Sequence, residues 1–260
     1  MSRIDDVMSA LAAKNRKALV AYLCMGDPTH EASIDHAVAC AEAGADVLEL
    51  GVPFSDPTAD GAAIAQASER AIRAGGGLDR AIEAAREIRK RTNVPLLLFG
   101  YYNPIFVRGE ERTVKDAAAA GVDGLLVVDL PVDEAAPLRA SCKQSGLSLV
   151  PLLTPTSSPA RIARTKAVLA ECSVGFVYYV SVTGVTGTAE ANLEDAGKRA
   201  AELEKQIGAP VVVGFGIDSP DKARAAAKGA HGVVVGSAIV RRIHEKGDPA
   251  ELVRALRAAI

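Results

Sequence analysis

The sequence predicts a (β/α)8 barrel, a ring of eight parallel strands that alternate with helices. Eight short runs rich in Val, Leu and Ile are almost continuous in apolar residues, as strands covered by helices on both faces are. Longer segments rich in Ala, Glu and Arg separate these runs. The 260 residues fit one such barrel, so we expect a single domain over residues 1–260. A doubly wound sheet is the alternative, but no GxGxxG follows the first strand.

The expected elements follow one another along the chain. The strands cover residues 18–23, 46–50, 95–99, 124–128, 148–153, 175–180, 211–214 and 232–235. The helices cover residues 30–43, 61–74, 78–91, 110–120, 133–145, 158–170, 190–207, 218–228 and 237–257. The pattern departs from a minimal barrel in two ways, because an extra helix precedes the first strand and two helices separate the second strand from the third.

Local signals mark where several of these helices begin and end. The phrases SSPAR and DSPDK each place a Ser before a Pro, which suits the first turn of a helix. Gly44, Gly121 and Gly229 follow helical segments at the position of a left-handed C-cap. The phrase AxAGAD before a strand recurs twice clearly and once weakly, as repeated βα units would produce. The three copies occupy residues 41–50, 118–128 and 226–235.

Composition argues against several classes of protein. A net charge of −2 and a pI near 6.1, without basic blocks, argue against a nucleic-acid binder. The four cysteines are widely spaced and form no CxxC pair, which is typical of buried thiols in a reducing compartment. The four scattered histidines argue against a metal site. The N-terminus lacks a signal peptide's apolar core, and no run of about 18 apolar residues exists, so we expect a soluble cytoplasmic protein.

The loops after the last strands predict a phosphate site, since barrel sites lie at the carboxyl ends of the strands. GFGI (214–217) and GSAIV (236–240) each join a strand to a helix, and free N–H groups at such glycines and helix starts bind anions. The Ser237 hydroxyl would be a further donor, and TGVTG (183–187) suits a closing flap. The alternative is that these glycines only make tight turns. None of the three loops contains Lys or Arg, so neutral donors would hold the phosphate.

Two carboxylates are the candidate acid/base groups. Glu49 ends the second strand inside the barrel mouth, where loss of water would raise its pKa. Asp60 lies at the far end of a Pro-rich loop. The structural alternatives are an ion pair for Glu49 and an N-cap for Asp60. No expected strand contains the lysine that a Schiff-base aldolase needs, so the pattern favours isomerisation or retro-aldol cleavage of a phosphorylated small molecule.

Six phrases carry a family resemblance along essentially the whole chain. LELGVPFSDPTADG, GYYNPI, VVDLP, YYVSVTGVTG, VGFGI and VGSAIV, in this order and spacing, resemble the tryptophan synthase α subunit. The resemblance implies a barrel that cleaves indole-3-glycerol phosphate to indole and glyceraldehyde 3-phosphate. It also implies a partner, a pyridoxal phosphate (PLP)-containing β subunit that receives the indole through a tunnel in an α2β2 complex. No cofactor is expected in this chain.

The resemblance also implies roles for individual residues. Glu49 would protonate indole C3 and help to cleave the carbon–carbon bond, Asp60 would accept the indole N–H, and Tyr178 would position the substrate near Glu49. The implied phosphate ligands are Gly187, Phe215, Gly216, Gly236 and Ser237. The implied indole pocket and closing loop contain Tyr22, Tyr101, Tyr102 and Thr186. Pro53, Asp56, Pro57, Asn103 and Pro104, on loops expected to be exposed, would contact the β subunit.

The chain departs from the family pattern at two places. Ala62 replaces the usual proline after ADG, which could loosen the loop that carries Asp60, and Cys24–Met25 replaces the usual Thr-Ala before GDP. Neither change removes a group that the chemistry needs. Two other functions stay open on the sequence: a sugar-phosphate isomerase, and a subunit whose main role is to bind and activate a partner.

Overall fold

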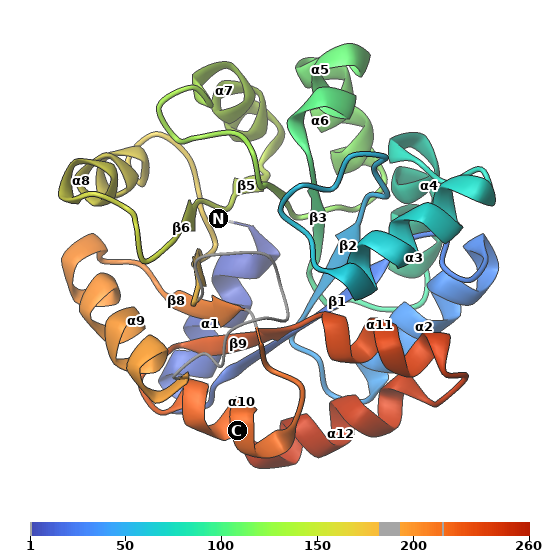
Figure 1. Ribbon diagram of the computed structural model, residues 1–260. Coiled ribbons are helices and arrows are strands. Elements are labelled where there is room, and N and C mark those ends of the chain that lie inside the picture. The colour runs from blue at the N-terminus through green and yellow to red at the C-terminus, as the bar shows by residue number, and fades with distance from the viewer. Residues whose placement is uncertain (1, 182–192, 215) are drawn as a thin grey trace.

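Parallel strands form a ring at the centre of the molecule, and helices surround them (Figure 1). The computed structural model describes residues 2–181, 193–214 and 216–260. Along the sheet, neighbours follow the order β5-β4-β3-β2-β1-β9-β8-β7-β6. The strands are β1 (Ala18–Cys24), β2 (Val47–Gly51), β3 (Leu96–Gly100), β4 (Gly124–Val127), β5 (Ser148–Leu149), β6 (Leu152–Leu153), β7 (Val177–Val180), β8 (Val211–Gly214) and β9 (Gly232–Val235).

The segment 148–153 closes the ring, although it was expected to be one strand. Its first half, β5, pairs with β4, and its second half, β6, pairs with β7. Pro151 lies between the halves and has no N–H to donate, which interrupts the ladder. The segment still joins both neighbours, because Val150 N–H donates to Leu125 O at 2.9 Å and Pro151 O accepts from Tyr178 N–H at 2.9 Å. The (β/α)8 prediction is confirmed.

The helices confirm the two predicted additions, α1 before the first strand and the pair α3 and α4 between β2 and β3. Two details differ from expectation. The helix expected over 237–257 is broken at residues 245–248, and α5 was not predicted. The described helices are α1 (Arg3–Ala13), α2 (His30–Glu42), α3 (Ala62–Arg73), α4 (Leu78–Arg89), α5 (Tyr102–Arg108), α6 (Glu110–Ala119), α7 (Ala136–Ser145), α8 (Pro159–Val168), α9 (Leu193–Ile207), α10 (Pro220–Ala227), α11 (Ser237–His244) and α12 (Pro249–Ala259).

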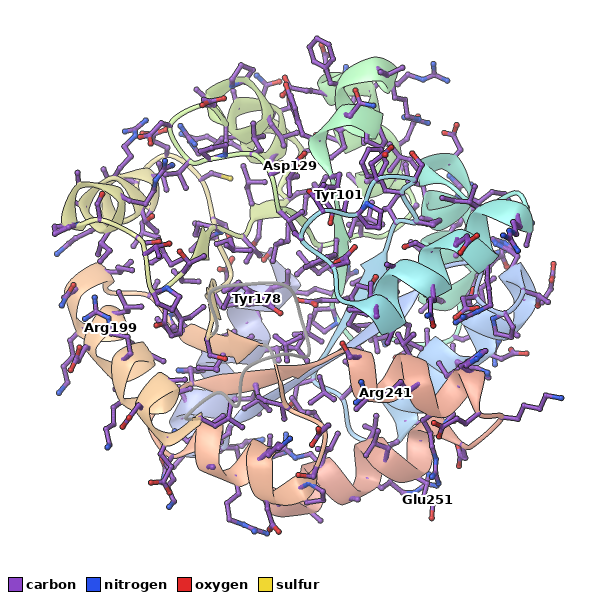
Figure 2. The ribbon with its side chains drawn as sticks, viewed as in Figure 1. Tyr101, Asp129, Tyr178, Arg199, Arg241 and Glu251 are labelled. Atoms are coloured by element: carbon purple, nitrogen blue, oxygen red, sulfur yellow. The ribbon has the colours of Figure 1, made fainter. Side chains whose placement is uncertain are left out.

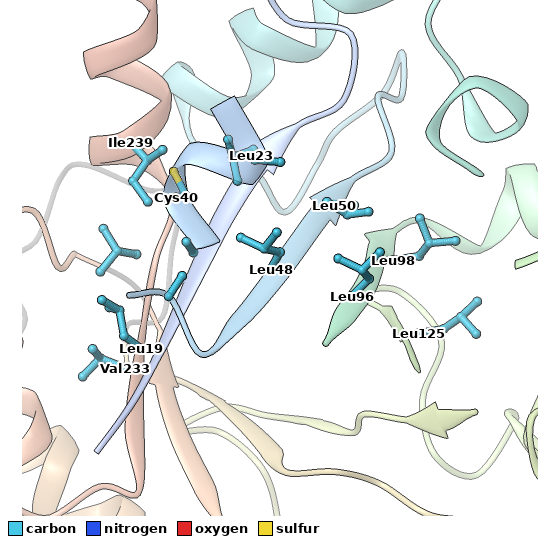
Figure 3. Close-up of a cluster of buried hydrophobic side chains, with 14 of the residues drawn as sticks. Leu19, Leu23, Cys40, Leu48, Leu50, Leu96, Leu98, Leu125, Val233 and Ile239 are labelled. Atoms are coloured by element: carbon cyan, nitrogen blue, oxygen red, sulfur yellow. The ribbon is translucent and has the colours of Figure 1, made fainter. Parts of the chain in front are cut away.

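Strand side chains alternate between the helical layer and the barrel interior. On the outer face, Leu19, Leu48, Leu96 and Val233 belong to one buried cluster with helix residues such as Ile239 (Figure 3). These side chains bury the apolar faces of the surrounding helices, and this burial is the main favourable term for the fold. The continuous apolar strands of the sequence therefore follow from burial on both sides.

The inner face is filled from below by α1. Val20, Val47 and Leu97 point inward and form a second buried cluster with Ile4 and Met8 of this helix. Helix α1 therefore closes the end of the barrel opposite the carboxyl ends of the strands. The interior is a packed core up to the layer of Val20 and Val47, and the next inward layer lies at the mouth.

The first copy of the AxAGAD repeat joins a strand to a helix at the closed end of the barrel. Asp46, just before β2, accepts the Leu19 N–H at 2.8 Å and an Arg257 N–H at 2.7 Å. The stem of Arg257 lies across Gly44, whose φ is +108°, and a Cβ there would come within 3.0 Å of the arginine Cγ. The glycine is thus required both by its backbone conformation and by the arginine above it.

The second copy repeats this arrangement at β4. Asp123 accepts the Leu96 N–H at 2.9 Å, an Arg89 N–H at 2.7 Å and an Arg3 N–H at 2.8 Å. In the weak third copy, His231 replaces the aspartate, and its Nε2 lies 3.3 Å from the carbonyl oxygen of Met8. The repeat therefore marks where helices are tied to the strands at the closed end of the barrel.

Asp123→Ala should lower the free energy of unfolding by roughly 2–4 kcal/mol, because it leaves the Leu96 N–H and Arg89 without their buried acceptor. Urea denaturation followed by circular dichroism measures this loss. The control is Asp35→Ala, which removes an exposed pair with Arg91 and should stay within about 0.5 kcal/mol of the unsubstituted chain. Equal losses in the two variants would contradict the anchoring role of Asp123.

Candidate active site

Glu49 is a buried carboxylate that faces the mouth of the barrel. It lies on β2, and only 1% of its surface is exposed. Among the described residues, its Oε1 has no hydrogen-bond partner and no basic side chain forms an ion pair with it. Burial raises its pKa from 4.5 to about 8. The structure therefore does not support the alternative that Glu49 is half of a structural ion pair.

The period of the strands explains why Glu49 lies where it does. Val47 points into the packed interior, so Glu49, two residues later, points inward one layer closer to the mouth. Tyr22 pairs with Glu49 across the β1–β2 ladder. Tyr178 lies two residues after the inward-pointing Phe176. The same alternation thus points one carboxylate and two tyrosines into the barrel.

Two glycines make room for these tyrosines. A Cβ on Gly51 would lie 2.2 Å from the Tyr22 hydroxyl oxygen, and one on Gly214 would lie 2.1 Å from the Tyr178 hydroxyl oxygen. Any larger residue would push the rings away. Figure 2 shows Tyr178 projecting across the centre of the ring of strands. At the mouth, each of these two tyrosine rings therefore packs directly against glycine backbone.

Both tyrosines are held in their neutral form. Burial raises the pKa of Tyr178 well above 10, and the nearby carboxylates of Glu49 and Asp60 raise it further. The pKa of Tyr22 is raised in the same way, chiefly by burial and then by the groups around it, which include Cys24 and both carboxylates. Each ring can therefore present a hydroxyl donor and an apolar face to a ligand.

Asp60 ends the loop after β2 and is positioned by Tyr101. The Tyr101 hydroxyl donates to the Asp60 carboxylate and accepts the Ala59 N–H at 3.0 Å. The Asp60 N–H donates to Pro57 O at 3.0 Å. The ring of Phe54 stacks on Tyr101 with centroids 4.9 Å apart. The two ends of this loop are thus gathered around one tyrosine.

Asp60 does not serve as the N-cap of α3. The cap is Gly61, and no side chain of the described chain caps this helix. Burial raises the pKa of Asp60 to about 6, although the hydrogen bond from Tyr101 opposes the rise. The structure thus brings together two carboxylates that titrate differently, with Glu49 largely protonated near neutrality and Asp60 largely ionised.

Tyr101 and Tyr102, which follow β3, point to different parts of the structure. Tyr101 faces Asp60, whereas the hydroxyl of Tyr102 donates to Glu110 on α6 at 2.9 Å. The Tyr102 backbone N–H donates to Asp129 at 2.7 Å. Tyr102 is the first residue of α5, so its side chain points into the helical layer. The structure therefore does not group Tyr102 with the other predicted pocket residues.

Three of the predicted phosphate ligands, Gly216, Gly236 and Ser237, are among the described residues. Ser237 is the first residue of α11 and Gly236 is its N-cap, so the N–H groups of this helix start are not used within the helix. Gly216 has a φ of +73° and is exposed beside the end of β8. Thr186, Gly187 and Phe215 lie outside the described residues.

The loops predicted to contact a partner are only partly exposed. Asp56 and Asn103 are exposed, and Pro57 and Pro104 are half-buried. Pro53 is buried, so the expectation that it lies on an exposed surface was wrong. It packs against the turn before α4, where its Cγ would lie 3.2 Å from a Cβ on Gly76.

Helix α5 adds two apolar residues that the sequence analysis missed. Phe106 is 65% exposed and Val107 is 77% exposed. In the sequence they belong to the apolar run IFV (105–107) that follows GYYNP, but no helix was predicted there. They lie beside Asn103, so the exposed part of the predicted partner surface is larger and more apolar than expected.

The described ranges contain no group of three or more His, Cys, Asp or Glu residues arranged to hold a metal ion. No helix in those ranges is long and apolar enough to cross a membrane. Fold and site together define a (β/α)8 barrel whose mouth holds two carboxylates of different pKa, an arrangement typical of an enzyme site.

Comparison with known proteins narrows this class. The sequence model of the family described as "Tryptophan synthase alpha chain" matches residues 8–259. The alpha chain of Geobacter sulfurreducens is 48% identical, with 100% of this chain and 99% of that protein covered. The alpha chain of Geotalea daltonii is 47% identical over 94% of this chain and 91% of the other. The chain belongs to the tryptophan synthase alpha chain family.

Solved structures agree. The tryptophan synthase subunit alpha of Legionella pneumophila matches with a TM-score of 0.89 and 34% identity, over 100% of this chain and 98% of that one. A Mycobacterium tuberculosis tryptophan synthase structure matches with a TM-score of 0.88 and 35% identity, also over 100% and 98%. The protein is thus a carbon–carbon lyase of tryptophan biosynthesis that cleaves indole-3-glycerol phosphate to indole and glyceraldehyde 3-phosphate. This confirms the predicted family and reaction and sets aside the isomerase alternative.

The burial of Glu49 should cost stability in a pH-dependent way. A carboxyl whose folded pKa is raised contributes stability below its ordinary pKa of 4.5, and this contribution is lost as the pH rises through about 8. Glu49→Gln, which stays neutral, should therefore raise the midpoint of thermal unfolding by at least about 3 °C at pH 8. The gain should shrink as the pH falls towards 5.

Calorimetry across this pH range measures the effect, with Glu134→Gln as the control because Glu134 is exposed before α7. The control should show no pH-dependent gain. A Glu49→Gln variant that is no more stable than the unsubstituted chain at pH 8 would contradict the buried, unpaired state of Glu49.

Proposed function

We propose that Glu49, Asp60 and Tyr178 carry out the cleavage. The observation that supports this most directly is the buried Glu49, whose pKa is about 8 and whose Oε1 has no partner among the described residues, near the same tyrosines as Asp60, whose pKa is about 6. A general acid must be protonated and a charge-stabilising carboxylate must be ionised, and this pair meets both needs near neutrality.

The proposed sequence has two proton transfers. Glu49 donates its proton to C3 of the indole ring, and ionised Asp60 accepts a hydrogen bond from the ring N–H, which stabilises the positive charge on the indolenine. The Glu49 carboxylate then removes the proton from the hydroxyl on the adjacent glycerol carbon. The carbon–carbon bond breaks, its electrons return to the ring, and indole and the aldehyde are formed. Glu49 ends protonated, ready for another turnover.

The tyrosines at the mouth would hold the substrate for these steps. Tyr22 and Tyr101 offer ring surfaces to the indole, and the neutral Tyr178 hydroxyl positions the glycerol chain beside Glu49. We place the phosphate group at Gly187, Phe215, Gly216, Gly236 and Ser237, with Thr186 on the closing loop. The N–H groups at the start of α11, which make no hydrogen bonds within the helix, support this position.

We also propose that residues 1–260 form one cytoplasmic barrel domain that works with a β chain in an α2β2 complex. PLP would be held by the β chain, and this chain would use no cofactor. The contact surface would comprise Asp56, Pro57, Asn103 and Pro104 together with the exposed face of α5. The support is the exposure of Phe106 and Val107, because contiguous exposed apolar side chains mark interaction surfaces.

Glu49→Gln should lower kcat for indole release from indole-3-glycerol phosphate by roughly 100- to 10,000-fold, because it removes the proton donor. Asp60→Asn should lower kcat by about 100-fold or more, because the neutral amide cannot stabilise the cationic ring. Direct detection of indole from the purified chain measures both, with Glu134→Gln as the control that keeps full turnover. Full indole release by Glu49→Gln would refute its assignment as the acid.

Phe106→Asp should weaken stimulation by the β chain while leaving indole release by the isolated chain unchanged. A charge in the centre of an apolar contact should raise the apparent Kd by roughly 10-fold or more. Titration with the β chain, followed by indole release, measures it. Gln206→Asp, which places a charge on the exposed face of α9, is the control. Equal stimulation of both variants would show that α5 lies outside the contact.

A further inference from the structure

The loop after β1, residues 26–28, contains a buried carboxylate, Asp27, that has no role in the proposed reaction. Asp27 is 4% exposed and forms a bidentate pair with Arg70 of α3, with Nε–Oδ1 and Nη2–Oδ2 distances of 2.7 and 2.8 Å. A bidentate arginine–carboxylate pair fixes direction as well as distance, because two parallel hydrogen bonds restrain the guanidinium plane. Arg70 is 30% exposed, so the pair lies at the edge of the buried region.

The loop and α3 are also packed together around this pair. Gly26 has a φ of +96°, and a Cβ there would lie 3.3 Å from the Cβ of Ala71. Ala67 and Ala71 belong to a buried cluster with Tyr22 and Cys24 at the end of β1. One face of α3 therefore rests on the carboxyl end of β1, beside the mouth of the barrel.

The start of α3 is joined directly to Asp60. Gly61 caps the helix without any side-chain hydrogen bond, and α3 begins at Ala62. Arg70 lies nine residues after Gly61, which is about 13 Å along the axis of a regular helix. A helix of this length moves as a rigid element, so the orientation at Arg70 is transmitted to its first residue. Tyr101 holds Asp60 from the other side.

A buried ion pair is a poor source of stability, since removing two charges from water offsets most of their attraction. Its better attested use is to select one arrangement of the parts that it joins. Here the joined parts are a loop of the fixed barrel and the helix that follows Asp60.

We propose that Asp27 and Arg70 are positioning residues for the cleavage: their bidentate pair fixes α3 against the end of β1 and thereby holds Asp60 where it meets the indole N–H. The inference rests on the proposed role of Asp60. Neither residue touches the substrate, so both act through the helix.

The test is a double-mutant cycle on kcat in the isolated chain. Asp27→Asn should lower kcat roughly 10- to 100-fold with little change in KM, because displacement of a reacting group costs rate more than binding. In the Asp60→Asn background, Asp27→Asn should have no further effect on kcat, since the group that it positions is already lost. Arg70→Lys, which keeps the charge but not the bidentate geometry, should fall between the unsubstituted chain and Asp27→Asn.

Arg73→Ala is the matched control, because it removes an exposed ion pair with Glu69 on the same helix. It should keep kcat unchanged. Equal losses of kcat from Asp27→Asn in both backgrounds, or a lower thermal midpoint with normal kcat, would overturn the positioning role. Failure of the proposed function would be recognised separately, as full activity of Asp60→Asn by itself. If Asp27→Asn does not fold, the same cycle with Arg70→Lys decides the question.

Discussion

The site depends on the burial of Glu49 in the barrel mouth without a partner among the described residues. Such burial costs stability, and it persists only where the surrounding structure is strong enough to impose it. The support comes from the layer below, where Val47 and the neighbouring inward side chains pack against α1. The closed end of the barrel, where Asp46 and Asp123 bind strand N–H groups, thus keeps the strands that carry the site in place.

The pKa values of the two carboxylates differ because the two residues lie on different parts of the fold. Glu49 lies on a central strand, where it loses nearly all contact with water. Asp60 lies at the end of a loop, remains half-exposed and accepts a hydrogen bond from Tyr101. Burial therefore acts more strongly on the first pKa than on the second. One protonated and one ionised carboxylate follow from the architecture itself, since no basic side chain of the described residues contributes to either pKa shift.

The sequence was most informative where the structure is regular. Continuous apolar runs located the strands, and a strand end located Glu49, because strand period and barrel topology leave little freedom. Tyr178 was indicated only by the family resemblance. It failed where local signals conflict or contacts are distant. Pro151 divides an apolar run that still closes the ring, and α5 is too short for a periodic pattern. The N-cap alternative for Asp60 looked reasonable locally, but its partner, Tyr101, lies on another strand end.

Ala62 shows how the chain compensates for a weak local signal. It is the first residue of α3, a position where proline is favoured because its ring presets the backbone. With alanine there, and with Gly61 as a cap lacking a side chain, the sequence around this helix start does little to fix its position. The restraint comes instead from contacts distant in the chain, Tyr101 on one side and the Asp27–Arg70 pair on the other. Asp60 is therefore held between Tyr101, which binds its carboxylate, and a helix that is fixed to the barrel at Arg70.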